Sequence, residues 1–159
     1  MTRRVDWVVF DVGGTLVDET RMWRTWAQRI GVSEARFLKE LDDVLAARLH
    51  HREVFARLAP GLDIAAAERA APFHITRGDF FDDALPALEA LAARGFQVAV
   101  AANQPEVTET VLPANAAGML SVFLPRGPWG RVHATRPHAA QAALSVEHLT
   151  DLAGLLGGD

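Results

Sequence analysis

The chain has 159 residues, half of which are apolar, and it carries a formal net charge of −4 with a pI of about 5.8. This length suits one domain with a small insertion, and the apolar content excludes an intrinsically disordered chain. The acidic balance excludes a nucleic-acid partner, which needs a clustered basic face, and the absence of cysteine excludes disulfides and thiolate zinc sites.

The hydropathy of the sequence indicates in which cellular compartment we expect the protein. The sequence has no uncharged apolar run of about 18 residues, and its start lacks the apolar stretch of a secretory signal. We therefore expect a cytoplasmic protein that has no membrane partner. The sequence does not indicate an oligomeric state.

The first predicted element is a strand over residues 5–10 (VDWVVF), whose apolar and β-branched residues suit a buried position. The strand ends at Asp11, and two glycines and Thr15 follow. A carboxylate at the end of a strand, above a loop of free backbone amides, can attack or hold an electrophile. The neutral alternative is that Asp11 only begins an Asp-Gly turn.

Helical spacing of apolar residues follows, from about residue 20 to residue 72. Ser33 and Asp63 stand where the N-caps of two of these helices are expected. Three or four helices in a row without a strand predict an inserted helical unit over residues 18–79. The core domain would then consist of residues 1–17 and 80–159.

Strands and helices alternate in the rest of the chain. The sequence predicts a helix over 83–95, a strand over 96–102, a helix over 105–117 weakened by Pro113, a strand over 119–124, a loop over 125–137, and one or two helices from 138 with a last strand in 153–158. Asp82 or Asp83 is expected to cap the first of these helices. This order predicts an α/β fold with a doubly wound parallel sheet.

Parallel strands bring their carboxyl ends to one edge of a sheet, where ligands bind in α/β folds. Asp11 follows the first predicted strand and Asn103 follows the second. We therefore expect both side chains to face one crevice. Asn103 has an equally simple alternative role as a turn former after a strand.

The order of a strand, Asp-Val-Gly-Gly-Thr-Leu, a helical insertion, a helix and a second strand ending in VAVAANQ resembles the haloacid dehalogenase superfamily of hydrolases, over roughly residues 5–105. The resemblance implies that Asp11 is a nucleophile that forms a covalent aspartyl intermediate. It also implies that residues 18–79 form a helical cap that closes over the sheet and selects the substrate. The implied activity is hydrolysis of a small phosphorylated metabolite, with Mg²⁺ as cofactor.

The same resemblance assigns roles in the loop after Asp11. Gly14 would let the backbone approach the phosphate, and Thr15 would brace the loop beside it. Mg²⁺ would be held by Asp11 and by the carbonyl of Gly13, with other oxygens completing an octahedron.

Several positions depart from the family pattern. Gly13 stands where phosphatases of the family carry a second aspartate, the general acid, and losing such a group typically costs about 10²–10⁴-fold in rate. Some relatives, including true dehalogenases, also lack this aspartate. Ala102 replaces the usual Ser or Thr of the second motif, so the side-chain amide of Asn103 would have to bind the phosphate instead.

The remaining two motifs are also altered. Arg136, followed by Pro137 and an expected alanine-rich helix, is the candidate for the phosphate-binding lysine, although arginine is bulkier and the exchange is not conservative. A solvated loop arginine is the alternative. Asp159 would be the first acid of the fourth motif, but a terminal residue is expected to be a poor metal ligand.

Three hypotheses follow. The first is a hydrolase of phosphomonoesters with impaired turnover. The second is a catalytically silent relative that binds a phosphorylated ligand, or a protein partner through Trp23, Trp26 and Phe37. The third notes that DVGGT is also similar to the first phosphate loop of sugar kinases and actin-like ATPases, which need two such domains and a second strand after the threonine.

Overall fold

The computed structural model describes residues 5–100, 111–137 and 139–156. The chain divides into two compact units. Among the described residues, the first unit contains those up to Asp18 and those from Phe80 onward, and the second contains Glu19–Asp79. The role of the second unit as a cap stays a prediction.

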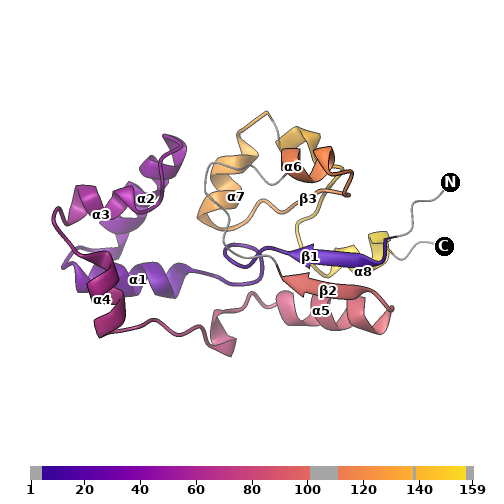
Figure 1. The fold of residues 1–159 in the computed structure, drawn as a ribbon, viewed down its shortest axis with the longest axis horizontal. Helices are drawn as coiled ribbons and strands as arrows, with labels where there is room; N and C mark the ends of the chain where they lie inside the picture. The colour runs from indigo at the N-terminus through magenta and orange to yellow at the C-terminus, as the bar shows by residue number, and fades with distance from the viewer. Residues whose placement is uncertain (1–4, 101–110, 138, 157–159) are drawn as a thin grey trace. The chain divides into compact units, whose positions relative to one another are not determined.

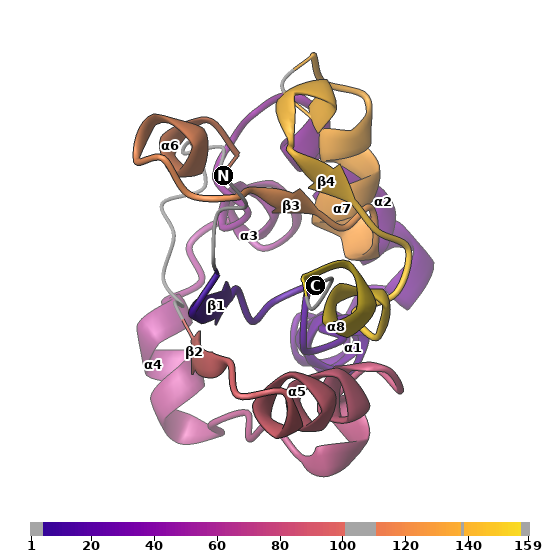
Figure 2. The same ribbon diagram turned by 90° about the vertical axis from the view of Figure 1, so that its right-hand side faces the viewer.

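Short parallel strands and surrounding helices form the first unit. Its elements are β1 (Trp7–Phe10), α5 (Ala84–Ala93), β2 (Gln97–Val100), α6 (Val111–Ala116), β3 (Val122–Phe123), α7 (Gly127–Ala134), a 3-10 turn (Ala139–Gln141), β4 (Leu144–Ser145) and α8 (Asp151–Leu156). Strand β1 pairs in parallel with β2, and β3 pairs in parallel with β4. Figures 1 and 2 show α5 running beside β2 and α8.

The predicted α/β class is therefore confirmed. In the part of the chain that the structure describes, the strands form two separate two-stranded sheets. A single doubly wound sheet stays a prediction. The pairing that matters for the site is that of β1 with β2, in which Phe10 lies opposite Val100, because it places the carboxyl ends of the two strands together.

An apolar cluster holds β1 in place. Its buried members come from β1, the loop after it, α5 and the chain from residue 146 onward; they are Phe10, Leu16, Val17, Ala84, Ala87, Leu91, Val146, Leu149, Leu152 and Ala153. The buried residues of α5 are two small alanines, Ala84 and Ala87, and the larger Leu91 farther along the helix. Since Leu16 and Val17 belong to this cluster, the loop after Asp11 is anchored by burial.

The second unit is helical, as predicted. It contains α1 (Thr20–Arg29), α2 (Glu34–Ala46), α3 (Glu53–Leu58), α4 (Ile64–Ala70) and a 3-10 turn (Arg77–Asp79). Both N-cap predictions are confirmed, because the Ser33 side chain accepts a hydrogen bond from the Arg36 N–H and Asp63 accepts one from the Ala66 N–H. No helix in the described ranges is long and apolar enough to cross a membrane.

Aromatic side chains form the core of this second unit. Trp23 stacks on Phe37 with ring centroids 5.9 Å apart, and Phe37 meets Phe55 edge to face. Trp23, Trp26 and Phe37 are all buried, with exposed fractions of 5% or less. The hypothesis that these three residues form a partner surface is therefore wrong.

The prediction of a loop over 125–137 is wrong, because this segment contains α7. The helix starts at Gly127, has Pro128 in its first turn and shows little apolar periodicity. Proline fixes φ at a helical value where its missing N–H costs nothing, so it starts a helix that an apolar pattern does not reveal.

The predictions for the following segment also need correction. Arg136 is followed by a 3-10 turn and by strand β4, not by an alanine-rich helix. The described part of the predicted last strand, 153–156, lies in α8 instead. Leu152 and Ala153 of α8 are buried in the core cluster, and this tertiary contact decides the conformation of a short apolar run.

Asp79 ties the end of the second unit to α1. Its two carboxylate oxygens accept hydrogen bonds from Nε and Nη2 of Arg21, both at 2.5 Å, and Oδ2 also accepts from the backbone N–H and hydroxyl of Thr76. The bonds from Arg21, followed by those from Thr76, hold the pKa of Asp79 far below its usual range. A depressed pKa means that the folded state gains stability wherever the carboxylate is ionised.

We expect Asp79→Asn to lower the midpoint of thermal unfolding by several degrees at pH 7. The stabilisation is complete well above the unfolded pKa of about 3.9 and is lost progressively as the pH falls through and below this value toward the lower folded pKa, so the difference between the variant and the wild type should shrink steadily below about pH 4. Thermal unfolding followed by circular dichroism from pH 7 to pH 3 checks this. Asp43→Asn is the control, because the pair of Asp43 with Lys39 is exposed. A constant difference across the pH range would contradict the prediction.

Candidate active site

Asp11 lies directly after the last residue of β1, at the carboxyl end of the β1–β2 pair. Its side chain is half-buried. This burial raises the pKa of Asp11, and a hydrogen bond from the backbone of Val12 partly opposes the rise. The carboxylate is thus partly withdrawn from water, which favours its use as a nucleophile or a base.

The loop after Asp11 folds back on itself. The N–H groups of Leu16 and Val17 both donate to the carbonyl of Val12 at 2.9 Å, and the N–H of Gly14 donates to the carbonyl of Val17 at 2.9 Å. The Thr15 N–H also points to Val12, at 3.2 Å. The prediction of a loop of free amides is therefore wrong for Gly14 to Val17, since these four groups bind the loop's own carbonyls.

Gly14 is required by the backbone. Its φ is +69°, a conformation that side chains other than glycine adopt at a cost, and the residue is buried. Gly127, at the start of α7, also has a positive φ, of +68°, and a Cβ on residue 127 would lie 3.3 Å from the Cα of Gly14. The backbones at Gly14 and Gly127 therefore lie close together, and the approach of Gly14 to a phosphate stays a prediction.

We expect Gly127→Ala to destabilise the protein more than Gly95→Ala does. Both glycines have positive φ, which costs an alanine about 1–2 kcal/mol, but only Gly127 lies against another backbone, since a Cβ on Gly95 would meet open space. Urea unfolding of the two variants measures the difference. Equal losses of unfolding free energy would show that the contact between Gly127 and Gly14 is loose.

The loop after Asp11 leads directly into helix α1 at Thr20. Between the end of β1 and the start of α2 at Glu34, where every residue is described, the chain forms no second strand. Sugar kinases and actin-like ATPases need such a strand, so the structure disfavours the third hypothesis.

Arg126 and Asp83 form a pair beside this loop that the sequence did not reveal. Nη1 of Arg126 donates to Oδ1 of Asp83 at 2.6 Å, Nη2 donates to the Thr15 carbonyl, and the guanidinium lies 4.0 Å from the centroid of the Phe81 ring. Both charged side chains are largely buried, with exposed fractions of 17% and 14%. A single arginine in a loop without apolar period carries no sequence signal that would have found this contact.

Asp83 precedes α5 but does not cap it through its side chain, contrary to one of the two capping predictions. Its second oxygen accepts a hydrogen bond from the Leu149 N–H at 2.8 Å instead. Burial alone would raise the pKa of Asp83, but the hydrogen bonds from Arg126 and Leu149 outweigh it and the pKa lies below the usual value. The carboxylate is therefore ionised at neutral pH, and its negative charge balances the positive charge of Arg126.

The remaining residues that were predicted to bind phosphate or metal are Asn103, Arg136 and Asp159. Asn103, with Ala102 before it, and Asp159 lie outside the described residues. Arg136 is half-buried just after α7, where its N–H donates to the carbonyl of His133. The proposed roles of Asn103 and Arg136 in phosphate binding stay predictions.

The residues near Asp11 offer only part of a magnesium site. Asp11 supplies one carboxylate and Gly13 a backbone carbonyl, and the described segments contain no group of three His, Asp or Glu side chains that could hold a metal. Mg²⁺ demands octahedral oxygen coordination, but it is often held by one or two carboxylates together with substrate phosphates and water. This donor set therefore fits a metal that arrives with a phosphate, and not one bound by protein alone.

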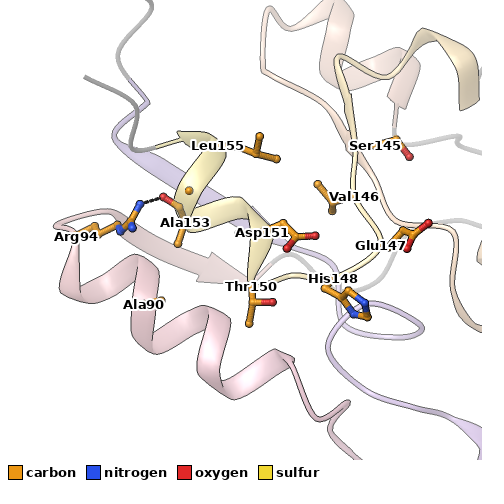
Figure 3. A pocket seen from close by; sticks show the side chains of 11 residues that line it. Ala90, Arg94, Ser145, Val146, Glu147, His148, Thr150, Asp151, Ala153 and Leu155 are labelled. Carbon is orange, nitrogen blue, oxygen red and sulfur yellow. Dashed lines mark hydrogen bonds between the residues drawn. The ribbon is translucent and has the colours of Figure 1, made fainter.

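A shallow depression of about 850 Å³ lies elsewhere in the first unit, between α5, α8 and the segment before α8. Figure 3 shows His148 and Asp151 along it, and Arg94 donating a hydrogen bond to the Ala153 carbonyl at its far side. None of the predicted site residues lines this depression.

A protein-family model described as "Hydrolase: haloacid dehalogenase-like hydrolase" matches residues 5–127. The matched range includes Asp11, the helical second unit and Arg126, and it ends before Arg136. Neither a curated protein nor a solved structure gave a significant match.

Proposed function

Because the chain belongs to the haloacid dehalogenase-like hydrolase family, we propose that it hydrolyses small phosphomonoesters slowly, with Asp11 as the nucleophile and Mg²⁺ as the cofactor. The observation that carries the proposal is the position of Asp11. A half-buried carboxylate with a raised pKa stands at the carboxyl end of β1, at the start of a loop held by its own hydrogen bonds.

In the proposed reaction, a carboxylate oxygen of Asp11 attacks phosphorus and the P–O bond to the substrate alcohol breaks. The result is an aspartyl phosphate and an alkoxide, which takes its proton from water. A water molecule then attacks the aspartyl phosphate and releases inorganic phosphate, regenerating the Asp11 carboxylate. The atoms and charges of these two steps balance with Asp11, the substrate and water alone.

Slow turnover follows from Gly13. Glycine cannot protonate the departing alcohol or activate the attacking water, and such proton transfer is typically worth about 10²–10⁴-fold. The wild type should therefore prefer substrates with good leaving groups, such as aryl phosphates, which need no acid. Alkyl phosphates should react far more slowly.

Charge must also be neutralised when an anionic phosphate approaches Asp11. Asn103 and Arg136 are the proposed protein ligands of the phosphate, and Asp11 and the Gly13 carbonyl would hold Mg²⁺. When bound, the metal supplies the positive charge that allows a carboxylate and a phosphate to meet. The loop residues Gly14 and Thr15 keep Asp11 in place, since their N–H groups are committed to the loop itself.

A binding protein without turnover is the second candidate, favoured by Gly13, which cannot transfer a proton to the leaving group or from the attacking water. Hydrolysis of 4-nitrophenyl phosphate, with Mg²⁺ and with EDTA, distinguishes the two candidates. Release of nitrophenol that requires Mg²⁺ supports the hydrolase. Binding of inorganic phosphate by calorimetry without any turnover would support the binding protein instead.

A further inference from the structure

The loop between Val12 and Val17 is the part of the first unit that positions Asp11. Its internal hydrogen bonds converge on the Val12 carbonyl and fix its shape, but they do not fix it relative to the rest of the core. Burial of Leu16 and Val17 in the core cluster does part of this, and two hydrogen bonds from outside the loop add to it. The Phe81 N–H donates to the Leu16 carbonyl at 3.0 Å, and Arg126 donates to the Thr15 carbonyl.

Arg126 is itself held rigidly. Its guanidinium is bonded to Asp83 on one side and lies over the ring of Phe81, an arrangement that combines an ion pair with a cation–π contact. Asp83 is bonded in turn to the Leu149 backbone. One side chain thus connects the loop after Asp11 with the segment before α5 and, through Asp83, with the segment before α8.

The backbone around Arg126 adds to this rigidity. Gly127 lies against Gly14, and at Gly130 a Cβ would lie only 2.7 Å from the carbonyl carbon of Pro125. The turn that carries Arg126 is therefore closely packed on both sides. Because Arg126 stands at the start of α7 and bonds to the Thr15 carbonyl, it links the position of α7 directly to that of the loop.

If the ion pair of Arg126 and Asp83 served stability alone, a buried arginine and aspartate would not be needed at these positions. Apolar residues of similar volume often replace a buried ion pair without loss of stability. Here the arginine makes a directional bond to a carbonyl four residues after the nucleophile, in a loop where a displacement of about 1 Å can cost about 100-fold in rate. Its Nε is buried and has no hydrogen-bond partner among the residues that the structure describes, so the hydrogen bonds of the guanidinium are those of its two Nη atoms.

On the premise of the hydrolysis proposed above, we infer that Arg126 is a positioning residue for that reaction: through the Thr15 carbonyl and Asp83, it holds the loop that orients Asp11. Arg126 does not touch the substrate. Its loss should lower kcat while changing KM little, because the phosphate ligands are elsewhere.

The test compares Arg126→Met, Arg126→Lys and Asp83→Asn with Arg94→Met as control. Arg94 is in the same unit but bonds the Ala153 carbonyl, away from the loop. For Arg126→Met we expect kcat with 4-nitrophenyl phosphate to fall about 10–100-fold. Lysine can keep one of the two bonds and should recover part of this loss, and Asp83→Asn should give an intermediate loss. Arg94→Met should leave kcat unchanged.

Amide hydrogen exchange provides the readout that does not depend on turnover. Exchange in the peptide that covers residues 11–17 should become faster in Arg126→Met and stay unchanged in Arg94→Met. An unchanged kcat per folded molecule, or unchanged exchange in this peptide, would overturn the role of Arg126. If the wild type shows no turnover, the proposed hydrolysis fails, and the exchange rates alone then decide whether Arg126 orders the loop. If Arg126→Met does not fold, Asp83→Asn and Arg126→Lys carry the same comparison.

Discussion

Asp11→Asn should abolish the hydrolysis of 4-nitrophenyl phosphate, with a loss on the order of 10³-fold or more, down to the rate of the uncatalysed reaction. The amide is nearly isosteric with the carboxylate but is a poor nucleophile, so no aspartyl phosphate can form. Because Asp11 is only half-buried, the substitution should leave the fold intact. Initial rates at saturating Mg²⁺, with thermal unfolding measured in parallel, check both statements.

Asp43→Asn is the matched control for this variant. It makes the same chemical change on an exposed helical surface of the second unit, where Asp43 pairs with Lys39. The control should keep the wild-type rate. If Asp11→Asn retained turnover that needed Mg²⁺, the nucleophile would lie elsewhere and the proposed mechanism would be wrong.

The pH dependence of the wild type offers a further readout of the same site. The nucleophile must be ionised, and burial raises the pKa of Asp11 above its ordinary value. The rate should therefore fall on the acid side at a higher pH than an exposed aspartate would give.

The first part of the chain was predictable because its signals are local. A β-branched run that ends in an aspartate predicts β1 and the position of Asp11, and the spacing of apolar residues predicts the helices of the second unit. Ser33 and Asp63 mark helix starts through a mechanism that acts within three residues of each cap, and both bonds are present.

The pair of Arg126 and Asp83 was not predictable for the opposite reason. These residues are 43 positions apart, and each has an ordinary local explanation, as a loop arginine and as a helix cap. Only the packing of α7 against the loop after Asp11 brings them together. Local sequence patterns do not indicate such a contact between distant residues. It depends on a short helix that begins at Gly127 and Pro128 and lies against Gly14.

The direction of the loop amides was also beyond the sequence pattern. The letters DVGGT indicate a tight turn, but they do not indicate whether its N–H groups face a ligand or the turn itself. In the structure the Val12 carbonyl collects three of them, so the turn is closed from inside. This difference matters because a closed turn stabilises Asp11 while leaving the neutralisation of phosphate charge to side chains and metal.

Gly13→Asp should raise the rate with alkyl phosphates by about 10²–10⁴-fold, since it returns a general acid to the position two residues after the nucleophile. The backbone permits the change, because Gly13 is not among the glycines with positive φ in the described part of the chain. The second carboxylate should also tighten the binding of Mg²⁺. The measurement is kcat/KM for an alkyl and an aryl phosphate as a function of Mg²⁺ concentration.

Gly13→Asn is the control that separates proton transfer from shape. Asparagine occupies nearly the same volume and can bind a metal through its oxygen, but it cannot donate a proton to the leaving alcohol. We expect the gain with Gly13→Asp to be larger for the alkyl than for the aryl phosphate, absent in Gly13→Asn, and lost in the double variant Asp11→Asn with Gly13→Asp. If Gly13→Asp and Gly13→Asn gave equal rates, protonation of the leaving group would not limit turnover, and the limit would have to come from the replaced phosphate ligands, Ala102 and Arg136.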